Sequence, residues 1–382
     1  MLVILYTLSL AVWIFFIIDA IIGLSTLDSL EKEEVLKDGP LLSVIVAARN
    51  EEKSIKSSVL SQLNQTYRNV EWLLINDRST DDTGKIMEEI KKSDKRVNVI
   101  HIKELPEGWL GKNHALYLGA KSATGKWLLF TDADVHYQKE AFGKALHYFE
   151  RNNLDHLTAA PNLNGNGFWL KSFVGFFLFG FSYFKRPWTA NNPRSKSGTG
   201  IGAFNLVLRK AYEQFGTHER IKMRPDDDLQ LGMKMKNEGY RQRIATALEL
   251  IEVEWYGTLK EALIGLEKNT FAGLNYRISM VLFAVVGTFL SHILPFFTVL
   301  VPDRLVILMS VANIVAIGIL YFMVIKKMTR FSPWMFLAFP LTGMIFIYSI
   351  IRASILTFKR GGIVWRGTAY KLSELRNMNR KD

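Results

Sequence analysis

The sequence predicts an α/β domain with a mostly parallel sheet, flanked by apolar helices on both sides along the chain. Between about residues 38 and 277, short apolar runs alternate with amphipathic stretches, which is typical of strands joined by crossover helices. The other apolar residues form long blocks outside this region, although 22% of the 382 residues are charged. This segregation indicates one water-facing domain and separate membrane-spanning segments.

The first apolar block covers residues 2–24, which is long enough for a helix to cross a hydrocarbon core of ~30 Å. We therefore predict an N-terminal transmembrane anchor over residues 1–25. A cleaved signal peptide is the alternative, but the block has neither a basic region before it nor a small-residue cleavage site.

Three further apolar blocks predict a C-terminal transmembrane region of two to three spans over residues 278–358, followed by a basic tail, 359–382. The blocks cover residues 279–301, 304–325 and 333–358. Lys and Arg in the loop at 326–330 favour a cytoplasmic position for that loop, and therefore for the middle domain. Pro340 and Gly343 interrupt the last block, which leaves open whether it crosses the membrane or re-enters.

The net charge and the motifs of the sequence limit the kinds of molecule that the protein is expected to bind. A net charge of +12 is compatible with anionic lipid, an anionic substrate or nucleic acid, but no aromatic-interleaved basic stripe or nucleic-acid-binding motif is present. We therefore predict a membrane partner and no nucleic acid. The absence of cysteine excludes disulfides, thiolate nucleophiles and cysteine-type zinc sites.

One apolar segment, residues 168–186, lies inside the predicted domain of residues 38–277. Its aromatic density and its basic flank favour a helix lying at the membrane interface, and a buried core helix is the alternative.

The middle region is predicted as a Rossmann-like order of strands and helices. The predicted strands cover residues 41–47, 70–75, 97–102 and 126–130, and the predicted helices 51–63, 81–92 and 114–122. Polar residues follow the ends of these strands, and ligands of open α/β sheets bind at that edge.

Asp132 and Asp134 follow the fourth predicted strand and flank one small residue. Two carboxylates in this position suit a hard divalent cation, Mn²⁺ or Mg²⁺, that neutralises a diphosphate leaving group. A solvated turn is the alternative interpretation.

Asp77 ends the second strand, where its carboxylate can accept an N–H of a nucleobase, and Ser79 or Thr80 is predicted as the N-cap of the next helix. Lys112 lies in a glycine-flanked loop before a helix, which suits a diphosphate, although a lone lysine in a loop is usually solvated.

Asp226, Asp227 and Asp228 begin a predicted helix after Pro225. Acids at a helix start are stabilised by the helix dipole, but three in a row exceed that need. Crowded like charges raise the pKa of at least one carboxyl toward the range of a general base.

The ordered motifs resemble those of the family 2 glycosyltransferases with the GT-A fold. The motifs are Ala48-Arg49-Asn50-Glu51-Glu52, Asn76-Asp77-Arg78-Ser79-Thr80-Asp81, Gly111-Lys112-Asn113-His114-Ala115, Thr131-Asp132-Ala133-Asp134 and Asp227-Asp228. The resemblance implies an inverting transferase with Ala48, Glu51 and Asp77 at the nucleoside, and with Lys112 and Asp132 at the diphosphate. It places Asp132 and Asp134 at the metal, and Asp228, with Asp227 beside it, as the catalytic base. It also places Gly202, Ala203 and Asn205 on the acceptor side, and a structural turn is the alternative for these three residues.

Within that family, the anchor, the C-terminal spans and the tail residues 362–367 are similar to bacterial carotenoid-acid (diaponeurosporenoate) and hopanoid-associated glycosyltransferases. This resemblance implies a single sugar, weighted toward glucose from UDP-glucose, moved to a membrane lipid or isoprenoid at the cytoplasmic face. Residues 265–269 depart from the Gln-x-x-Arg-Trp motif of processive synthases, which disfavours polymer synthesis. A processive polysaccharide synthase and a non-catalytic membrane scaffold stay as alternatives.

Overall fold

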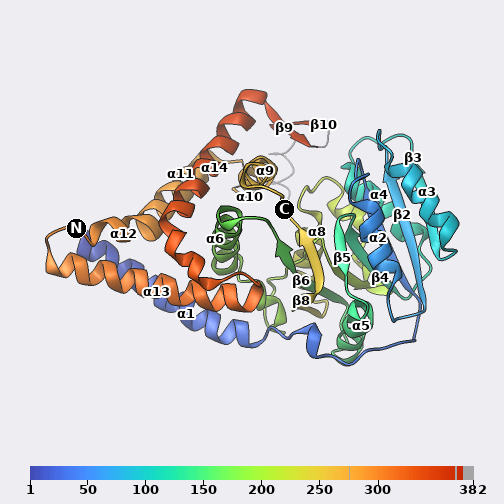
Figure 1. Ribbon diagram of the computed structural model, residues 1–382, viewed down its shortest axis with the longest axis horizontal. Coiled ribbons are helices and arrows are strands. Elements are labelled where there is room, and N and C mark those ends of the chain that lie inside the picture. The colour runs from blue at the N-terminus through green and yellow to red at the C-terminus, as the bar shows by residue number, and fades with distance from the viewer. Residues whose placement is uncertain (275, 366–367, 373–382) are drawn as a thin grey trace. The chain divides into compact units, whose positions relative to one another are not determined.

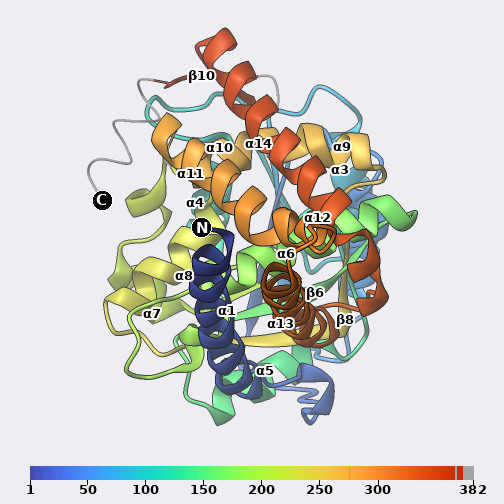
Figure 2. The same ribbon diagram turned by 90° about the vertical axis from the view of Figure 1, so that its left-hand side faces the viewer.

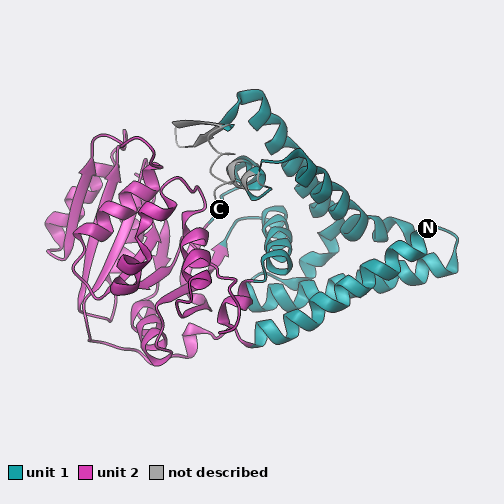
Figure 3. Cartoon of the chain, turned by 180° about the vertical axis from the view of Figure 1, so that it is seen from behind, with its two compact units in different colours: residues 1–25, 164–186, 255–382 teal, residues 26–163, 187–254 magenta. Residues whose placement is uncertain are grey.

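The computed structural model describes residues 1–274, 276–365 and 368–372, and for residues 268, 269, 272, 363–365 and 368–371 it describes the backbone alone. The chain forms two compact units (Figure 3). One unit, here the sheet unit, contains residues 26–163 and 187–254. The other, here the helical unit, contains residues 1–25, 164–186 and 255–382. The predicted tail residues Arg366 and Gly367 and residues 373–382 lie outside the described residues.

The sheet unit is built on a mixed sheet with the strand order β3-β2-β1-β4-β7-β6-β8-β5 (Figure 1). Its strands are β1 (Leu42–Ala48), β2 (Val70–Asp77), β3 (Val97–Ile102), β4 (Trp127–Asp132), β5 (Val135–Tyr137), β6 (His156–Asn164), β7 (Asn205–Leu208) and β8 (Gln242–Glu254). β1 pairs in parallel with β2 and with β4, whereas β7 is antiparallel to β4. The carboxyl ends of β1, β2 and β4 therefore meet at one edge.

Alternating side chains of the central strands enter two separate hydrophobic clusters. In β1, Val44 and Val46 face one cluster and Ile45 faces the other. The first cluster is closed by α2 (Ile55–Leu63), α3 (Thr83–Ser93) and α5 (Ala141–Arg151), and the second by α4 (Gly111–Ser122), α7 (Arg209–Phe215) and α8 (Asp227–Asn237). The predicted α/β architecture is confirmed, because continuous apolar strands need helices on both faces.

The predicted strands and helices of residues 41–122 are present within a few residues of their expected bounds. The predicted N-cap of α3 is wrong, because that helix begins only at Thr83 and Asp82 is its N-cap. Ser79 instead accepts a hydrogen bond from the Asn50 backbone N–H, and Asp81 accepts one from the Thr83 N–H. These bonds hold the loop between β2 and α3 in a non-helical conformation.

Within the described residues, the helical unit contains four helices that are long and apolar enough to cross a membrane. They cover Leu2–Ser25, Ile278–Thr298, Arg304–Met328 and Pro333–Arg360, one in the N-terminal part and three in the C-terminal part. The elements are α1 (Leu2–Ser25), α6 (Phe168–Lys185), α9 (Leu259–Gly265), α10 (Glu267–Gly273), α11 (Ile278–Thr288), η4 (Phe289–Ile293), α12 (Leu294–Thr298), α13 (Arg304–Met328), η5 (Pro333–Ala338) and α14 (Phe339–Arg360). α1 lies along α13, and α11 lies beside α14 (Figures 1 and 2).

α6 belongs to the helical unit, which interrupts the continuous domain expected over residues 38–277. It packs against α13 and α14, and Phe179 contacts Trp13, Tyr321 and Phe339. Phe168 and Trp169 at its start stay exposed. A helix that is apolar on most sides is buried most completely against other apolar helices, so α6 groups with them rather than with the sheet.

Two groups of ion pairs connect elements within the helical unit. Asp19 of α1 pairs with Arg186, which follows α6. Glu267, at the start of α10, pairs with Arg352 at 2.8 Å and with Arg360 at 2.6 Å, both on α14. The two pairs of Glu267 place the end of α14 beside the segment that immediately precedes α11.

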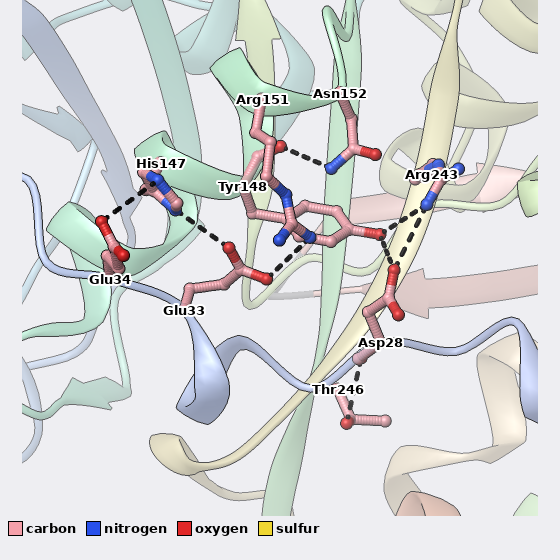
Figure 4. Close-up of polar contacts among 9 residues, drawn as sticks. All are labelled: Asp28, Glu33, Glu34, His147, Tyr148, Arg151, Asn152, Arg243 and Thr246. Carbon is pink, nitrogen blue, oxygen red and sulfur yellow. Dashed lines mark hydrogen bonds and ion pairs between the residues drawn. The ribbon is translucent and has the colours of Figure 1, made fainter.

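Residues 26–37 are bonded along the surface of the sheet unit to α5 and β8 (Figure 4). Asp28 accepts hydrogen bonds from Tyr148 at 2.8 Å and from Arg243 at 3.2 Å. Glu33 contacts His147 and Arg151 at 2.9 and 3.0 Å. The segment between α1 and β1 is therefore held by specific polar contacts rather than left as a loose linker.

Candidate active site

The loops after β1 and β2 interlock at the carboxyl edge of the sheet. The Glu51 backbone N–H donates to Thr83 Oγ1 at 2.7 Å, and Asn50 Oδ1 accepts from the Thr80 N–H at 2.8 Å. Asn50 and Arg78 both adopt a positive φ, near +55°, that is uncommon for residues other than glycine. These contacts outweigh the backbone strain and bring Ala48, Glu51 and Asp77 to the same edge.

Asp77 is buried, with 3% of its surface exposed, and lies against Arg78. Arg78 Nε donates to Asp77 Oδ1 at 2.7 Å and Nη2 to Oδ2 at 3.2 Å. A Cβ on Gly111 would overlap the Asp77 carboxylate and the Arg78 guanidinium. Glycine at the start of α4 therefore allows the backbone to approach this carboxylate closely.

A second group of charges surrounds Lys112, the second residue of α4. Lys112 Nζ lies 2.8 Å from Asp132 Oδ1 and 3.5 Å from Asp227 Oδ1. A pocket at this point is lined by Lys112, Leu116, Phe130, Thr131, Asp132, Gly202, Asn205, His218, Asp227, Asp228 and Leu231. Side chains more than 90 residues apart in sequence thus form one acidic site around a single lysine.

Glycines allow the loop at residues 198–202 to press against α8. A Cβ on Gly200 would overlap the Asp228 backbone carbonyl, and a Cβ on Gly232 would overlap the Thr199 carbonyl. A Cβ on Gly202 would lie 2.5 Å from Asp132 Oδ2 and 3.2 Å from Asp228 Oδ2. The two carboxylates therefore converge on the open face of Gly202.

The pKa values in this pocket respond to burial and to crowding of charge. Burial raises the pKa of Asp227 to about 7, although Lys112 opposes the rise and Asp228 and Asp132 add to it. Burial also raises the pKa of Asp228, again against the effect of Lys112. For Lys112, burial acts to lower the pKa, but Asp132, Asp227 and Asp228 outweigh it and raise it. One lysine thus leaves part of the negative charge uncompensated.

The structure brings six of the predicted site residues into the pocket lining: Lys112, Asp132, Gly202, Asn205, Asp227 and Asp228. Asp134, in the turn between β4 and β5, is outside this lining, as is Ala203, whose carbonyl accepts hydrogen bonds from Thr131 and Tyr137. His218 is a lining residue that sequence reasoning missed, because a single histidine before the Asp226 to Asp228 run carries no motif.

The donor set fits a hard divalent cation. Asp132 and Asp228 offer converging carboxylate oxygens. Burial raises the pKa values of Asp227 and Asp228, and the neighbouring carboxylates add to the rise; a bound cation would oppose both effects. Within residues 1–274, 276–365 and 368–372, however, no three His, Cys, Asp or Glu side chains are already arranged as ligands of one metal.

Known proteins resemble this chain in sequence. The model described as Glycosyl transferase family 2 matches residues 43–216. An uncharacterized glycosyltransferase of Haemophilus influenzae is 41% identical over 124 residues, which cover 32% of this chain and 36% of that protein. The UDP-Glc:alpha-D-GlcNAc-diphosphoundecaprenol beta-1,3-glucosyltransferase WfaP of Escherichia coli is 37% identical over 112 residues, which cover 29% of this chain and 41% of WfaP. The matches span less than half the length of these two relatives.

The fold also resembles a solved structure, the mannosyltransferase PcManGT from Pyrobaculum calidifontis in complex with GDP-Man and Mn²⁺. The TM-score is 0.54 at 14% identity, and the match covers 94% of this chain and 98% of that one. The architecture is thus a GT-A like α/β fold with a mostly parallel sheet. Residues 43–216 thus match the family 2 glycosyltransferases in sequence.

Proposed function

We propose that this protein is an inverting glycosyltransferase that moves one sugar, glucose from UDP-glucose, to a membrane lipid or isoprenoid acceptor at the cytoplasmic face. The observation that carries the proposal is the pocket in which Lys112, Asp132, Asp227 and Asp228 converge at the carboxyl edge of the sheet. A displacement at a sugar carbon needs a base for the attacking hydroxyl and positive charge for the leaving diphosphate, and a carboxylate and a lysine of this pocket could meet these two needs.

In the proposed reaction, Asp228 removes the proton from the acceptor hydroxyl as its oxygen attacks the anomeric carbon. The bond from that carbon to the diphosphate oxygen breaks, and the nucleoside diphosphate leaves with the electron pair. Lys112 would pair with the departing phosphate, and Asp227, whose Oδ1 lies 3.5 Å from Lys112 Nζ, would hold the lysine in place. Asp132 and Asp134 would hold Mn²⁺ or Mg²⁺, which when bound supplies further positive charge to the diphosphate oxygens.

The nucleoside would bind at the neighbouring strand ends, with Asp77 accepting from the base and with Ala48 and Glu51 beside it. Asp77 and Arg78 together present a fixed acceptor and a cation at this point. The GDP-Man of the Pyrobaculum mannosyltransferase makes GDP the second nucleotide to test.

A lipid acceptor is supported by the four apolar helices and by the name of WfaP, whose acceptor is a diphosphoundecaprenol-linked sugar. Gly202, Ala203 and Asn205 would lie on the acceptor side. A carotenoid acid, a hopanoid and a glycerolipid all satisfy this chemistry.

The test is calorimetric titration of the detergent-purified full chain with UDP and with GDP, each with and without Mn²⁺ or Mg²⁺. We expect metal-dependent binding of UDP, and loss of the metal dependence in Asp132→Ala and Asp134→Ala variants.

An Asp226→Ala variant is the matched control, because Asp226 pairs with Arg224 and Gln230 outside the pocket lining. If folded wild-type protein binds neither nucleotide, the non-catalytic scaffold becomes the better reading. If UDP binds equally well without metal, the assignment of Asp132 and Asp134 is wrong.

A further inference from the structure

A chain of three buried polar side chains lies behind the pocket. Gln242 begins β8, His156 begins β6 and Asn205 begins β7, and these strands are neighbours in the sheet. The three residues are at most 2% exposed. Because an unpaired polar group in such a place is costly, each of these side chains is expected to orient so that its donors and acceptors find partners.

Two backbone groups fix the orientation of the Gln242 amide. The Thr199 N–H can only donate, and it lies 2.9 Å from Gln242 Oε1. The Gly232 carbonyl can only accept, and it lies 2.9 Å from Gln242 Nε2. The oxygen and the nitrogen of this amide are therefore not interchangeable.

The Gln242 amide in turn fixes the His156 ring. Gln242 Nε2 lies 2.6 Å from His156 Nδ1, and an amide nitrogen only donates. Nδ1 is therefore the acceptor, and the neutral ring carries its proton on Nε2. Burial lowers the pKa of His156 to about 4, so the ring is neutral at pH 7.

The His156 ring then fixes Asn205. His156 Nε2 lies 2.9 Å from Asn205 Oδ1 and donates to it. The Asn205 amide nitrogen must point away from His156, and Asn205 lines the acidic pocket. Among the described residues, none accepts a hydrogen bond from Asn205 Nδ2.

We propose that Asn205 Nδ2 donates a hydrogen bond to a hydroxyl oxygen of the substrate, and that His156 and Gln242 are positioning residues that keep the amide turned toward the pocket. An ionised carboxylate has no hydrogen to donate, so a substrate hydroxyl can only donate to Asp132, Asp227 or Asp228. Lys112 is already engaged by two of these carboxylates. A hydroxyl that donates to a carboxylate can accept from Asn205. The hydroxyl is on the sugar donor or on the attacking acceptor, and the substrate class rests on the proposed function.

The orientation is tested without substrate by ¹⁵N NMR of protein labelled at its seven histidines. The signal that His156→Gln removes identifies His156. At pH 7 we expect a neutral ring protonated at Nε2. A ring protonated at Nδ1, or at both nitrogens, overturns the proposal even if the protein is an active transferase.

The role in binding is tested with Asn205→Asp and Gln242→Glu. Aspartate keeps the oxygen that faces His156 but removes both donor hydrogens. Glutamate at 242 accepts from His156 Nδ1–H, which reverses the ring's tautomer and turns the Asn205 amide around without touching the substrate. Asn191→Asp is the matched control, because Asn191 is also a buried asparagine of the sheet unit and lies outside the pocket lining.

Two measurements distinguish the two hydroxyls, with UDP and UDP-glucose as the probes. If the sugar hydroxyl is bound, the affinity for UDP-glucose relative to UDP falls about 3- to 10-fold in both test variants, the effect of one hydrogen bond. If the attacking hydroxyl is bound, that ratio is unchanged, but UDP release from saturating UDP-glucose, with water as acceptor, falls by a similar factor. Values equal to those of Asn191→Asp in both measurements contradict the proposal. Failure of wild type to bind UDP or GDP contradicts the proposed function instead and leaves the NMR result to decide the orientation.

Discussion

Adjacent carboxylates in this pocket have different surroundings. Asp227 has 3% of its side chain exposed and contacts Lys112, whereas Asp228 is half-buried and directs Oδ2 toward Gly202. The Asp228 carboxylate also accepts from the Leu229 N–H at 2.8 Å, which fixes its rotamer. The residue that faces the open side is the better candidate for the base, and its neighbour is the better candidate for holding the lysine.

An Asp228→Asn substitution is expected to reduce glycosyl transfer by about 10²- to 10⁴-fold, because an amide cannot take the proton. UDP affinity should change far less, since Asp228 does not contact the nucleotide in the proposed arrangement. The measurement is sugar transfer from radiolabelled UDP-glucose to membrane lipid, with UDP binding by calorimetry.

Asp226→Asn is the control for that substitution, because it removes the neighbouring charge outside the pocket lining. Equal loss of transfer in both variants would indicate a general effect of charge on α8 rather than loss of a base.

At the scale of elements, the contact between α8 and the loop at residues 198–202 decides the geometry of the pocket. This contact depends on Gly198, Gly200 and Gly232, where any Cβ would overlap backbone atoms of the opposing segment. Local sequence indicates a loop and a helix here, but it does not indicate that they touch. The strands and helices themselves were predictable, because apolar periodicity is a local property.

A Gly232→Ala substitution is expected to destabilise the sheet unit by about 1–3 kcal/mol through overpacking, and to weaken transfer by moving Asp228. The thermal midpoint should fall by several degrees, at about 2–4 °C per kcal/mol for a domain of this size. Thermal unfolding followed by tryptophan fluorescence checks the first effect.

Gly180→Ala is the matched control, because a Cβ on Gly180 in α6 would meet no atom within 4 Å. It should leave stability unchanged or raise it slightly, since alanine is the better helix former. A similar loss of stability in both variants would contradict the role given to the contact at Gly232.

At the scale of the whole molecule, buried histidines make stability depend on pH. Burial lowers the pKa of His156 to about 4 and that of His218 to about 3, below the ordinary value of 6.5. Between pH 6.5 and 4 the unfolded chain therefore binds more protons than the folded chain at these positions. Their contribution to stability is present above pH 6.5 and is lost as the pH falls.

The contribution of His156 is isolated by comparison with a His156→Gln variant, because effects of the acidic pocket occur in both proteins. From pH 7 to pH 5, wild type should lose about 2 kcal/mol more stability than the variant. Thermal midpoints at several pH values measure this difference. Parallel curves would mean that His156 is not held neutral in the folded protein.

Contacts within the helical unit favour one path for the last apolar block. Arg360 pairs with Glu267, just before α11 begins, whereas Phe339 contacts His292 near the far end of that apolar segment. α13 ends at Met328, five residues before Pro333. We therefore expect the last block, which begins partway along the neighbouring helices, to re-enter and return its end to the side of the loop at 326–330.

The chain contains no cysteine, so single introduced cysteines report this topology directly. In intact cells, an impermeant maleimide should label Pro302→Cys but neither Lys327→Cys nor Lys359→Cys. If both Pro302→Cys and Lys359→Cys are labelled while Lys327→Cys is not, the last block crosses the membrane fully. Labelling of Lys327→Cys would overturn the cytoplasmic position of the loop.

Sequence patterns alone predicted the α/β class, the four apolar segments and most of the residues that meet in the pocket. These depend on local properties, namely apolar periodicity, segment length and carboxylates at strand ends. Three features became visible only in the folded chain: Lys112 bridges Asp132 and Asp227, His156 and Gln242 orient Asn205, and α6 joins the helical unit. Each of these joins segments tens of residues or more apart, and the packing that brings them together leaves no pattern in the neighbouring sequence.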